Sequence, residues 1–231
     1  MPYTLTTPDG QTVTYARVTE VIRKVLARPA LHEWEIKGAV EYACRVGGDP
    51  VTVLRDFRRQ NRTAADRGTR IHAYAAAVLT GTTPPALLSS DKGYAWAFTN
   101  WLADNHERVA MTHVEQTLCR PWGKVAGTAD ALGERLGVRT VFDWKTVDEL
   151  TDDPSIDQVA QIGAYASMTC LVADGKIIPA ETLFIGTALV VQLAGDGTYR
   201  EHEVEILTAV DLWDAILDVY RVLRRIEQDR Q

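Results

Sequence analysis

Cysteine is scarce in this sequence, which has three in 231 residues: Cys44, Cys119 and Cys170. They are too far apart in the chain to form a CxxC metal-binding pair, and three thiolates are too few for a four-cysteine iron–sulfur cluster. We therefore expect buried structural thiols and no iron–sulfur cluster.

Long apolar runs are missing as well. No segment approaches the ~18 consecutive apolar residues that a transmembrane helix needs. The first residues have neither the basic start nor the apolar stretch of a signal peptide. We expect a cytoplasmic protein that makes no contact with a membrane.

Net positive charge is the third thing that the sequence lacks. Its 25 lysines and arginines are outnumbered by 31 acidic residues, which gives a net charge of −6. This argues against a protein that coats duplex DNA through bulk electrostatics, although it leaves room for a local basic channel. One basic cluster is interrupted only by Asp56 and Asp66; its members are Arg55, Arg58, Arg59, Arg62, Arg67 and Arg70.

Turn and capping residues indicate a mainly helical first part. Pro8-Asp9-Gly10 predicts a hairpin over 3–16, and Asp49-Pro50 predicts the start of a helix. The other helices predicted in this part span 19–28, 31–45, 65–79 and, capped by Ser90 or Asp91, the stretch up to 105.

The second part is rich in β-prone runs. These runs predict strands over 113–120, 124–134, 138–145 and 182–193. A helix that starts at Asp153-Pro154 is expected to reach Val172 and to be ended by Gly175. An amphipathic helix closes the chain over 208–226. The elements predict a single α/β domain, residues 1–231, with a mixed central sheet flanked by helices; residues 1–110 are mainly helical and residues 111–231 contain the sheet.

Three acidic residues are expected to meet on neighbouring strands of this sheet. If the first hairpin turn is centred at 122–123, Glu115 faces Asp130. If the second turn is centred at 136–137, Asp130 faces Asp143. Opposed Cβ atoms lie ~5 Å apart, so the three carboxylates would form one row. A bulge in either turn would shift this row by one residue.

Carboxylates so close together repel one another unless positive charge lies between them. Lys145 shares a strand face with Asp143 and supplies one positive charge. A hard cation, Mg²⁺ or Mn²⁺, would supply the rest of the positive charge, because such ions prefer oxygen ligands. The ion would polarise a phosphoryl oxygen and lower the pKa of a bound water, which Lys145 would orient or deprotonate. A solvated sheet face with scattered charge is the alternative.

Two further features bear on this site. Gln158, Gln161 and Tyr165 share one face of the predicted helix, where they would hydrogen-bond a phosphate or Lys145 or form an exposed polar stripe. His72 lies on a helix directly after the arginine cluster. A lone histidine is either a structural residue or a metal ligand.

The motifs and their order resemble the PD-(D/E)XK nucleases, specifically the RecB-like exonuclease branch. The matching segments are RGTRIH at 67–72, the strand of Glu115, GTAD at 127–130, VFDWKT at 141–146 and QIGAY at 161–165. Their spacing is most similar to that of the mitochondrial genome maintenance exonuclease and of related phage and CRISPR-associated exonucleases. The resemblance covers about residues 15–226; each motif is weak, but the five in order are specific.

The resemblance implies a PD-(D/E)XK core and a role for each site residue. The implied metal ligands are His72, Asp130, Asp143 and the carbonyl oxygen of Trp144. Glu115 would lie beside the metal and would bind a second ion or a metal-bound water. Lys145 would be the catalytic lysine, and Gln161 and Tyr165 would position it or the substrate strand. Several relatives carry an iron–sulfur cluster that this chain cannot form. RecB is fused to a helicase, whereas no GxxxxGK[ST] phosphate loop occurs here, which favours a stand-alone nuclease.

These observations predict a DNA nuclease that depends on Mg²⁺ or Mn²⁺. We expect it to degrade single-stranded DNA from an end, in replication, recombination or repair, within a bacterial or phage-infected cell. The arginine cluster and Gln158 are the candidate DNA-binding residues. A structure-specific or restriction-like endonuclease, a non-catalytic nucleic-acid-binding module and an interaction protein remain as alternatives.

Overall fold

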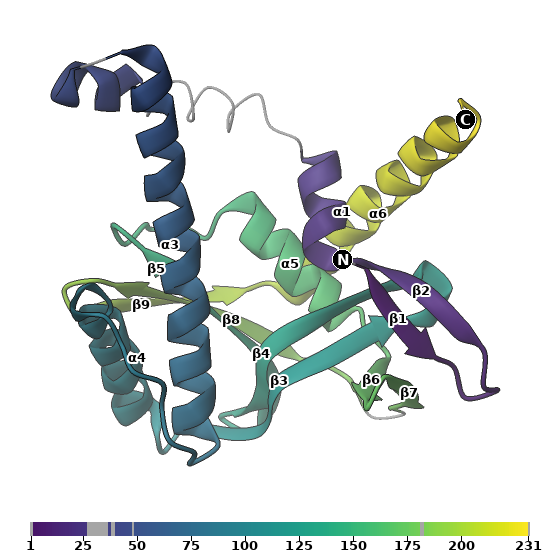
Figure 1. Cartoon of the computed structure of the whole chain (residues 1–231). Helices are drawn as coiled ribbons and strands as arrows, with labels where there is room; N and C mark the ends of the chain where they lie inside the picture. The colour runs from purple at the N-terminus through teal and green to yellow at the C-terminus, as the bar shows by residue number, and fades with distance from the viewer. Residues whose placement is uncertain (1, 27–36, 38–39, 48, 181–182, 231) are drawn as a thin grey trace.

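A computed structural model describes residues 2–26, 37, 40–47, 49–180 and 183–230, apart from the side chains of residues 50, 54, 58 and 60–62. The described residues form a mixed sheet with the strand order β2-β1-β7-β6-β3-β4-β5-β8-β9 (Figure 1). The strands are β1 (Tyr3–Thr6), β2 (Thr12–Arg17), β3 (Val109–Arg120), β4 (Val125–Arg135), β5 (Val138–Val147), β6 (Cys170–Ala173), β7 (Lys176–Pro179), β8 (Thr187–Ala194) and β9 (Tyr199–Val204).

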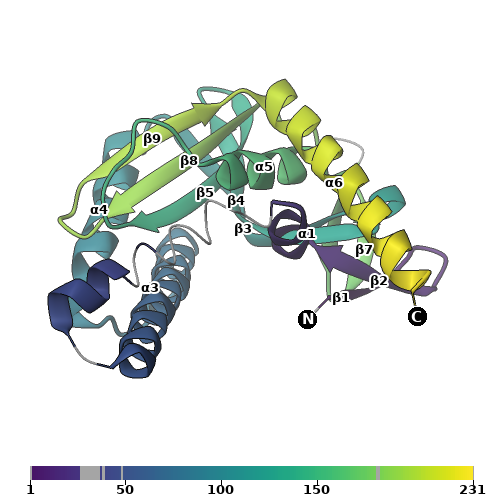
Figure 2. The same ribbon diagram turned by 90° about the horizontal axis from the view of Figure 1, so that it is seen from above.

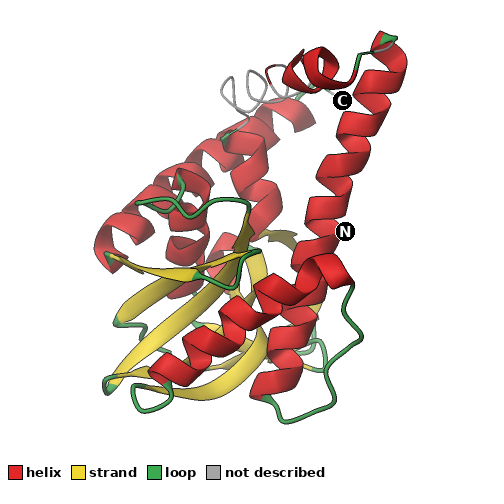
Figure 3. Ribbon diagram, turned by 90° about the vertical axis from the view of Figure 1, so that its left-hand side faces the viewer, coloured by secondary structure: helices red, strands yellow, loops and turns green. Residues whose placement is uncertain are grey.

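Helices lie against both faces of this sheet (Figure 2, Figure 3). The helices are α1 (Val18–Val25), α3 (Pro50–Leu79), α4 (Lys92–Asn105), α5 (Ile156–Ala166) and α6 (Ile206–Gln228), with short 3-10 turns η1 (Ser89–Asp91) and η2 (Pro121–Gly123). The α/β class and the mixed sheet flanked by helices are therefore confirmed. No helix within the described residues is long and apolar enough to cross a membrane.

The strand alternation assigns each central side chain to one of two cores. On β8, Ala188 and Val190 belong to the core under α1, α5 and α6. Leu189 and Val191 belong to the core under α3 and α4. This period of two is what a strand buried on both faces requires, and it explains the continuous apolar run of β8.

An aromatic cluster fixes β5 against α4. The ring of Trp144 lies 5.5 Å from that of Phe98 and 5.8 Å from that of Trp101, centroid to centroid. Trp144 is 1% exposed and Trp101 is fully buried. Truncating a buried tryptophan of this kind costs ~3–5 kcal/mol of stability. The cluster thus holds β5 firmly on one face, while its neighbours Asp143 and Lys145 point to the other.

The predicted strand register is confirmed. Val114 pairs with Ala131 and Gln116 with Ala129, so Glu115 stands opposite Asp130. On the other side, Ala131 pairs with Phe142 in the same antiparallel ladder that the turn at 136–137 predicts. One irregularity interrupts the β3–β4 ladder between 111 and 113, before the acidic row is reached.

Strand β4 has two partners along the same edge. Its residues 131–135 pair with β5, whereas Val125 and Ala126 pair in parallel with Ala16 and Arg17 of β2. The β2–β4 contact joins strands β2, β1, β7, β6, β3 and β4 into a ring around a small core. Strands β4 and β5 therefore separate just before Asp130, which creates a fork in the sheet.

The ring brings two cysteines together. Cys119 of β3 pairs directly with Cys170 of β6, and both are buried free thiols. Burial raises the pKa of Cys119 to about 12, so its thiolate is disfavoured. The prediction of structural thiols is confirmed for these two, whereas Cys44 is exposed.

Several predicted boundaries are wrong. The helix expected to reach Val172 ends at Ala166, and a hairpin of β6 and β7 follows. Asp174 and Gly175 have φ values of 50° and 72°, which is the backbone of a tight hairpin turn. Gly175 therefore turns a hairpin instead of ending a helix. Strand β9 was not predicted, and β8 begins at Thr187, later than expected.

The helix predictions of the first part differ in detail. Asp49 caps a single helix of 30 residues, α3, where two pieces were expected. Helix α1 begins at Val18 without a side-chain cap from Thr19. The helix predicted over 31–45 falls mostly outside the described residues, but residues 40–46 are helical. Asp91 occupies the N-cap of α4, but its side chain does not cap the helix and instead accepts hydrogen bonds from Arg70.

Candidate functional site

The candidate site lies at the fork between β4 and β5. Asp130 and Asp143 occupy the next opposed positions after the last ladder pair, Ala131 and Phe142. At this point the side chain of Asp130 replaces a backbone acceptor: its Oδ2 accepts a hydrogen bond from the backbone N–H of Trp144 at 2.8 Å. A side chain that replaces a strand hydrogen bond is held rigidly, so the fork fixes Asp130 in place.

Asp130 also joins the sheet to helix α3. Its Oδ1 lies 2.9 Å from Nδ1 of His72. Ligand atoms of His72, Glu115 and Asp130 all lie within 4.8 Å of one another. The three residues come from α3, β3 and β4, and the fold brings His72 and Asp130 together although they are 58 positions apart in the sequence. The sequence could not place His72; the structure puts it in the acidic row.

Glu115 has an unusual backbone. Its φ is 51°, a left-handed conformation that a non-glycine residue adopts at some energetic cost, of order 1–3 kcal/mol. Neighbouring positions Val114 and Gln116 keep regular pairing with β4. The strain is therefore confined to the residue whose carboxylate reaches His72 and Asp130.

Lys145 connects the acidic row to helix α5. Its Nζ lies 2.7 Å from Oδ2 of Asp143 and donates a hydrogen bond of 3.0 Å to Oε1 of Gln161. Nε2 of Gln161 in turn donates to the hydroxyl of Tyr165 at 2.9 Å. The predicted contact of Lys145 with the polar face of this helix is present for Gln161, and Tyr165 is linked to Lys145 only through Gln161. The chain of contacts fixes both the position and the orientation of the ammonium group.

The titration of these groups reflects crowded negative charge. Burial lowers the pKa of His72, but the hydrogen bond and charge of Asp130 outweigh it and raise that pKa overall. Burial and the charge of Asp130 raise the pKa of Glu115, although its side chain keeps access to solvent. Burial raises the pKa of Asp143, against the opposing effect of Lys145. The site thus favours bound protons, as a site short of positive charge does.

The groups around Lys145 are shifted as well. Burial lowers the pKa of Lys145, but the charges of Asp143 and Asp130 outweigh it and raise that pKa. Burial raises the pKa of Tyr165 well above its usual range, so its hydroxyl stays protonated. Asp157, in the first turn of α5, adds a further negative charge that raises the pKa of Lys145. The sequence analysis missed Asp157, whose only signal was its place beside Gln158.

The buried carboxylate of Asp143 is not hydrogen-bonded within the described part of the chain. Asp143 is 1% exposed, and neither of its oxygens makes a hydrogen bond to a described residue. Its Oδ2 has the ion pair with Lys145, and its Oδ1 has no described partner of either kind. A buried carboxylate oxygen left without a partner costs ~1–3 kcal/mol or more. Other buried polar atoms without a hydrogen-bond partner occur elsewhere in the described part of the chain, but Asp143 is the one carboxylate among them. A buried carboxylate without enough partners gains most from a bound cation or a proton.

Several predicted site residues lie apart from this cluster. The amide of Gln158 completes a capping box with Ser155 at the start of α5, so it serves the helix and does not contact Lys145. The ring of Trp144 packs on the opposite face of the sheet, in the aromatic cluster. The role of its carbonyl oxygen stays a prediction.

The arginine cluster divides into two groups along α3. Arg67 donates to Asp148 at 2.9 Å and lies 4.5 Å over the ring of Tyr94. Arg70 binds Asp91 through two nitrogens. Both are tied into the fold by acidic partners that the sequence analysis did not identify. The exposed members whose side chains are described are Arg55 and Arg59; those of Arg58 and Arg62 lie outside the described part.

Comparisons with known proteins add little to this picture. No family model matches the chain, and no curated protein matches it. It is similar to a solved structure described as "Crystal structure of SSO0001", with a TM-score of 0.34 and 14% sequence identity. That likeness covers 88% of this chain and 75% of the other, and it is too low to carry an argument. The function must therefore be argued from the site.

Proposed function

We propose that this chain is a nuclease of the PD-(D/E)XK type that hydrolyses single-stranded DNA from an end with the help of Mg²⁺ or Mn²⁺. The observation that carries the proposal is the arrangement around Asp143. This buried carboxylate has an unpartnered oxygen on one side and the ammonium group of Lys145 at 2.7 Å on the other. His72, Glu115 and Asp130 form a separate group whose ligand atoms lie within 4.8 Å of one another, and the charges of Asp130 and His72 act on the Asp143 carboxyl.

The donor set suits a hard divalent cation. Carboxylate oxygens and one imidazole are the ligand types that Mg²⁺ and Mn²⁺ share, and no described cysteine is near enough to favour a softer metal. Asp130, Asp143, Glu115 and His72 would hold the ion. Its charge would satisfy the free oxygen of Asp143 and reduce the repulsion that raises the pKa values in the site. When bound, such an ion polarises a phosphoryl oxygen and acidifies a water.

The protein's own groups would then bind and orient the phosphodiester. The ammonium of Lys145 would donate to a phosphoryl oxygen or to the attacking water, where a positive charge offsets the negative charge that develops. Gln161 would keep Lys145 at this position through its amide oxygen, and Tyr165 would fix the amide of Gln161 in turn. These two are positioning residues in this account.

Two features favour DNA as the substrate. The site resembles those of the RecB-like exonucleases in motif order, and the exposed arginines Arg55 and Arg59 lie on the helix that carries His72. Phosphate contacts by clustered arginines are the usual basis of strand binding without sequence preference. A structure-specific or restriction-like endonuclease would use the same site, so the ends of the substrate must be tested.

The test uses single-stranded DNA labelled at its 5′ or 3′ end, incubated with Mn²⁺ or with a chelator. We expect metal-dependent release of short labelled products by the wild type and none by Lys145→Ala. Lys145→Arg, which keeps the charge but not the geometry, should recover little activity. The label released first gives the polarity, and a circular strand left intact identifies an enzyme that needs an end.

The opposite results are equally clear. Cleavage that Lys145→Ala retains would place the activity elsewhere or in a contaminant. Binding of Mn²⁺ and DNA without any cleavage would make the chain a non-catalytic binding module. Cleavage of the circular strand would favour an endonuclease.

A further inference from the structure

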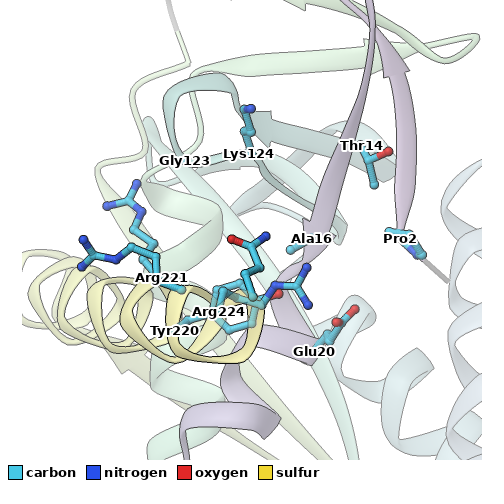
Figure 4. Close-up of a pocket in the computed structure, with 11 residues that line it drawn as sticks. Pro2, Thr14, Ala16, Glu20, Gly123, Lys124, Tyr220, Arg221 and Arg224 are labelled. Carbon is cyan, nitrogen blue, oxygen red and sulfur yellow. The ribbon is translucent and has the colours of Figure 1, made fainter. Parts of the chain in front are cut away.

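A second charged surface lies away from the acidic site, between the end of α6, the turn at η2 and the N-terminal hairpin. It is a pocket of about 940 Å³ (Figure 4). Lys124, at the end of η2, borders it on one side, and Arg221 and Arg224 of α6 border it on another, with the hairpin strands opposite α6. Its lining residues are Pro2, Thr14, Ala16, Glu20, Gly123, Lys124, Tyr220, Arg221, Arg224, Arg225 and Gln228.

The lining is strongly positive in a chain that is acidic overall. Four cationic side chains and one carboxylate, Glu20, line the pocket, which leaves a formal excess of three positive charges. The whole chain carries −6. The cations come from two elements that are far apart in the sequence, Lys124 from the turn before β4 and three arginines from α6. The fold has therefore gathered positive charge at this place.

The arginines are accessible and have weak local partners. Arg221 pairs with Asp218 one turn earlier on α6, and its side chain is 43% exposed. Arg224 lies 3.8 Å from Glu227, which is bound more closely by Lys24 of α1 at 2.6 Å. Exposed pairs of this kind contribute little to stability, about 0–1 kcal/mol. These guanidinium groups remain available to an anionic ligand.

An exposed aromatic ring lies in the turn that borders the pocket. Trp122 is 60% exposed, directly before the lining residues Gly123 and Lys124. The guanidinium of Arg120 lies 5.1 Å from its ring centroid, so the ring is supported on one side. A large exposed tryptophan beside clustered cations is the combination that binds single-stranded nucleic acid, by stacking on bases and contacting phosphates.

The charge has a structural explanation only in part. Cations near the C-terminal end of a helix stabilise its dipole, and Arg225 lies in the last turn of α6. That effect does not account for Trp122, which lies within η2. Lys124 caps the C-terminal end of this short 3-10 turn, so the effect does not explain why it lies close to the arginines of α6.

We propose that this pocket binds the phosphates of a single-stranded nucleic acid, and that Trp122 stacks on one of its bases. This proposal rests on the proposed function, because the pocket would be a second binding site for the same DNA strand. Asp130 lies six positions after Lys124 along β4, which is about 20 Å along an extended strand. A strand of several nucleotides would reach both places, whereas a small phosphodiester would occupy the acidic site alone.

The test measures the affinity of full-length protein for a fluorescent oligothymidylate in the presence of a chelator, where no cleavage occurs. The variant replaces Arg221, Arg224 and Arg225 by glutamine. The control replaces three exposed cations on other elements, Lys92, Arg108 and Lys176, by glutamine. Both variants lose the same charge, so a general electrostatic effect would weaken both equally.

We expect the pocket variant to bind the oligonucleotide at least about tenfold more weakly than the control does. The slope of log affinity against log salt should be smaller in magnitude by about 2, because each of the three lost phosphate contacts contributes roughly 0.7 to it. Trp122→Ala should lose about fivefold or more in affinity. Hydrolysis of bis(p-nitrophenyl) phosphate should be unchanged in the pocket variant and in Trp122→Ala, since that substrate is too small to reach the pocket from the acidic site.

Equal binding by the pocket variant and the control would overturn the proposal, whether or not the protein cuts DNA. Equal competition by polyglutamate would also overturn it, because the pocket would then be a general anion site. If the wild type cuts nothing but binds the oligonucleotide through this pocket, the proposed function fails while the binding site stands.

Discussion

Two aspartates of this protein have equally inaccessible side chains but different partners. Asp91 and Asp143 both have side chains that are 1% exposed. Asp91 accepts hydrogen bonds from two nitrogens of Arg70 and from the hydroxyl of Ser90, so both its oxygens are satisfied. Asp143 has one cationic neighbour, Lys145, and an oxygen with no hydrogen-bond partner among the described residues.

The titration of the two carboxyls follows this difference. The hydrogen bond and charge of Arg70 lower the pKa of Asp91 below its usual range. Burial raises the pKa of Asp143 above it. A satisfied buried carboxylate stabilises the fold, whereas an unsatisfied one costs stability and is kept for another reason. Two carboxyls with equal solvent exposure therefore have pKa values shifted in opposite directions, because Asp91 is fully paired near the surface whereas Asp143 lies deeper and has fewer partners.

The largest expected effect is on hydrolysis. Asp143→Asn should reduce metal-dependent cleavage of single-stranded DNA by about 10²–10³-fold or more, because a ligand and the partner of Lys145 are lost together. Asp91→Asn is the matched control and should keep nearly full activity per folded molecule. Initial rates at saturating Mn²⁺ decide the matter, and equal losses in the two variants would break the comparison.

The second effect is on metal-linked stability. Mn²⁺ at a hundredfold excess over its dissociation constant should stabilise the wild type by about 2.7 kcal/mol. Asp91→Asn should show the same gain, since its site is already satisfied. Asp143→Asn should show much less. Thermal unfolding with and without Mn²⁺ measures this, and a gain in all three proteins would place the ion elsewhere.

The third effect is on stability without metal. Asp91→Asn should lower the free energy of unfolding by about 1–2 kcal/mol, a modest value because Arg70 keeps some contact with solvent. Asp143→Asn should lower it less or raise it, since a buried charge is removed. Urea unfolding in a chelator compares them. A larger loss in Asp143→Asn would show that its carboxylate is structural.

The pH dependence of this pair has a definite sign. The folded-state pKa of Asp91 is lowered, so its contribution is present above the unfolded value of about 3.9 and is lost as the pH falls through the lower folded value. The stability difference between wild type and Asp91→Asn should therefore be full at neutral pH and should shrink below about pH 4. A difference that grows on acidification would contradict the assignment.

The smallest expected effect concerns the contacts of Lys145. Gln161→Ala should reduce the rate constant kcat by about tenfold with little change in KM, because it loosens Lys145 without removing a substrate contact. Tyr165→Phe, which removes only the hydroxyl bound to Gln161, should cost less. A rise in KM alone would mean that Gln161 binds substrate directly.

Much of the site was predictable because it depends on local rules. The turns at 122–123 and 136–137 set the register that brings Glu115, Asp130 and Asp143 into one row. Strand alternation separates Lys145 from Trp144, and helical spacing places Gln161 with Tyr165. These relations follow from the geometry of neighbouring strands and of a single helix turn.

The rest depends on contacts that no local pattern encodes. Arg67 and Arg70 look like a free basic cluster in the sequence, but their partners Asp148 and Asp91 are 81 and 21 residues away. The hairpin at Asp174-Gly175 has a turn signal that a helix pattern obscured. His72 reaches Asp130 only because α3 crosses the fork, which is a property of the whole fold.

The central claim is that the site around Asp143 hydrolyses phosphodiesters with a bound divalent cation. The measurement that tests it most directly is the cleavage of end-labelled single-stranded DNA by the wild type, with Mn²⁺ and with a chelator, at equal protein concentration. We predict rapid loss of label with Mn²⁺ and none with the chelator. Intact DNA under both conditions, from a protein that is folded, would contradict the account.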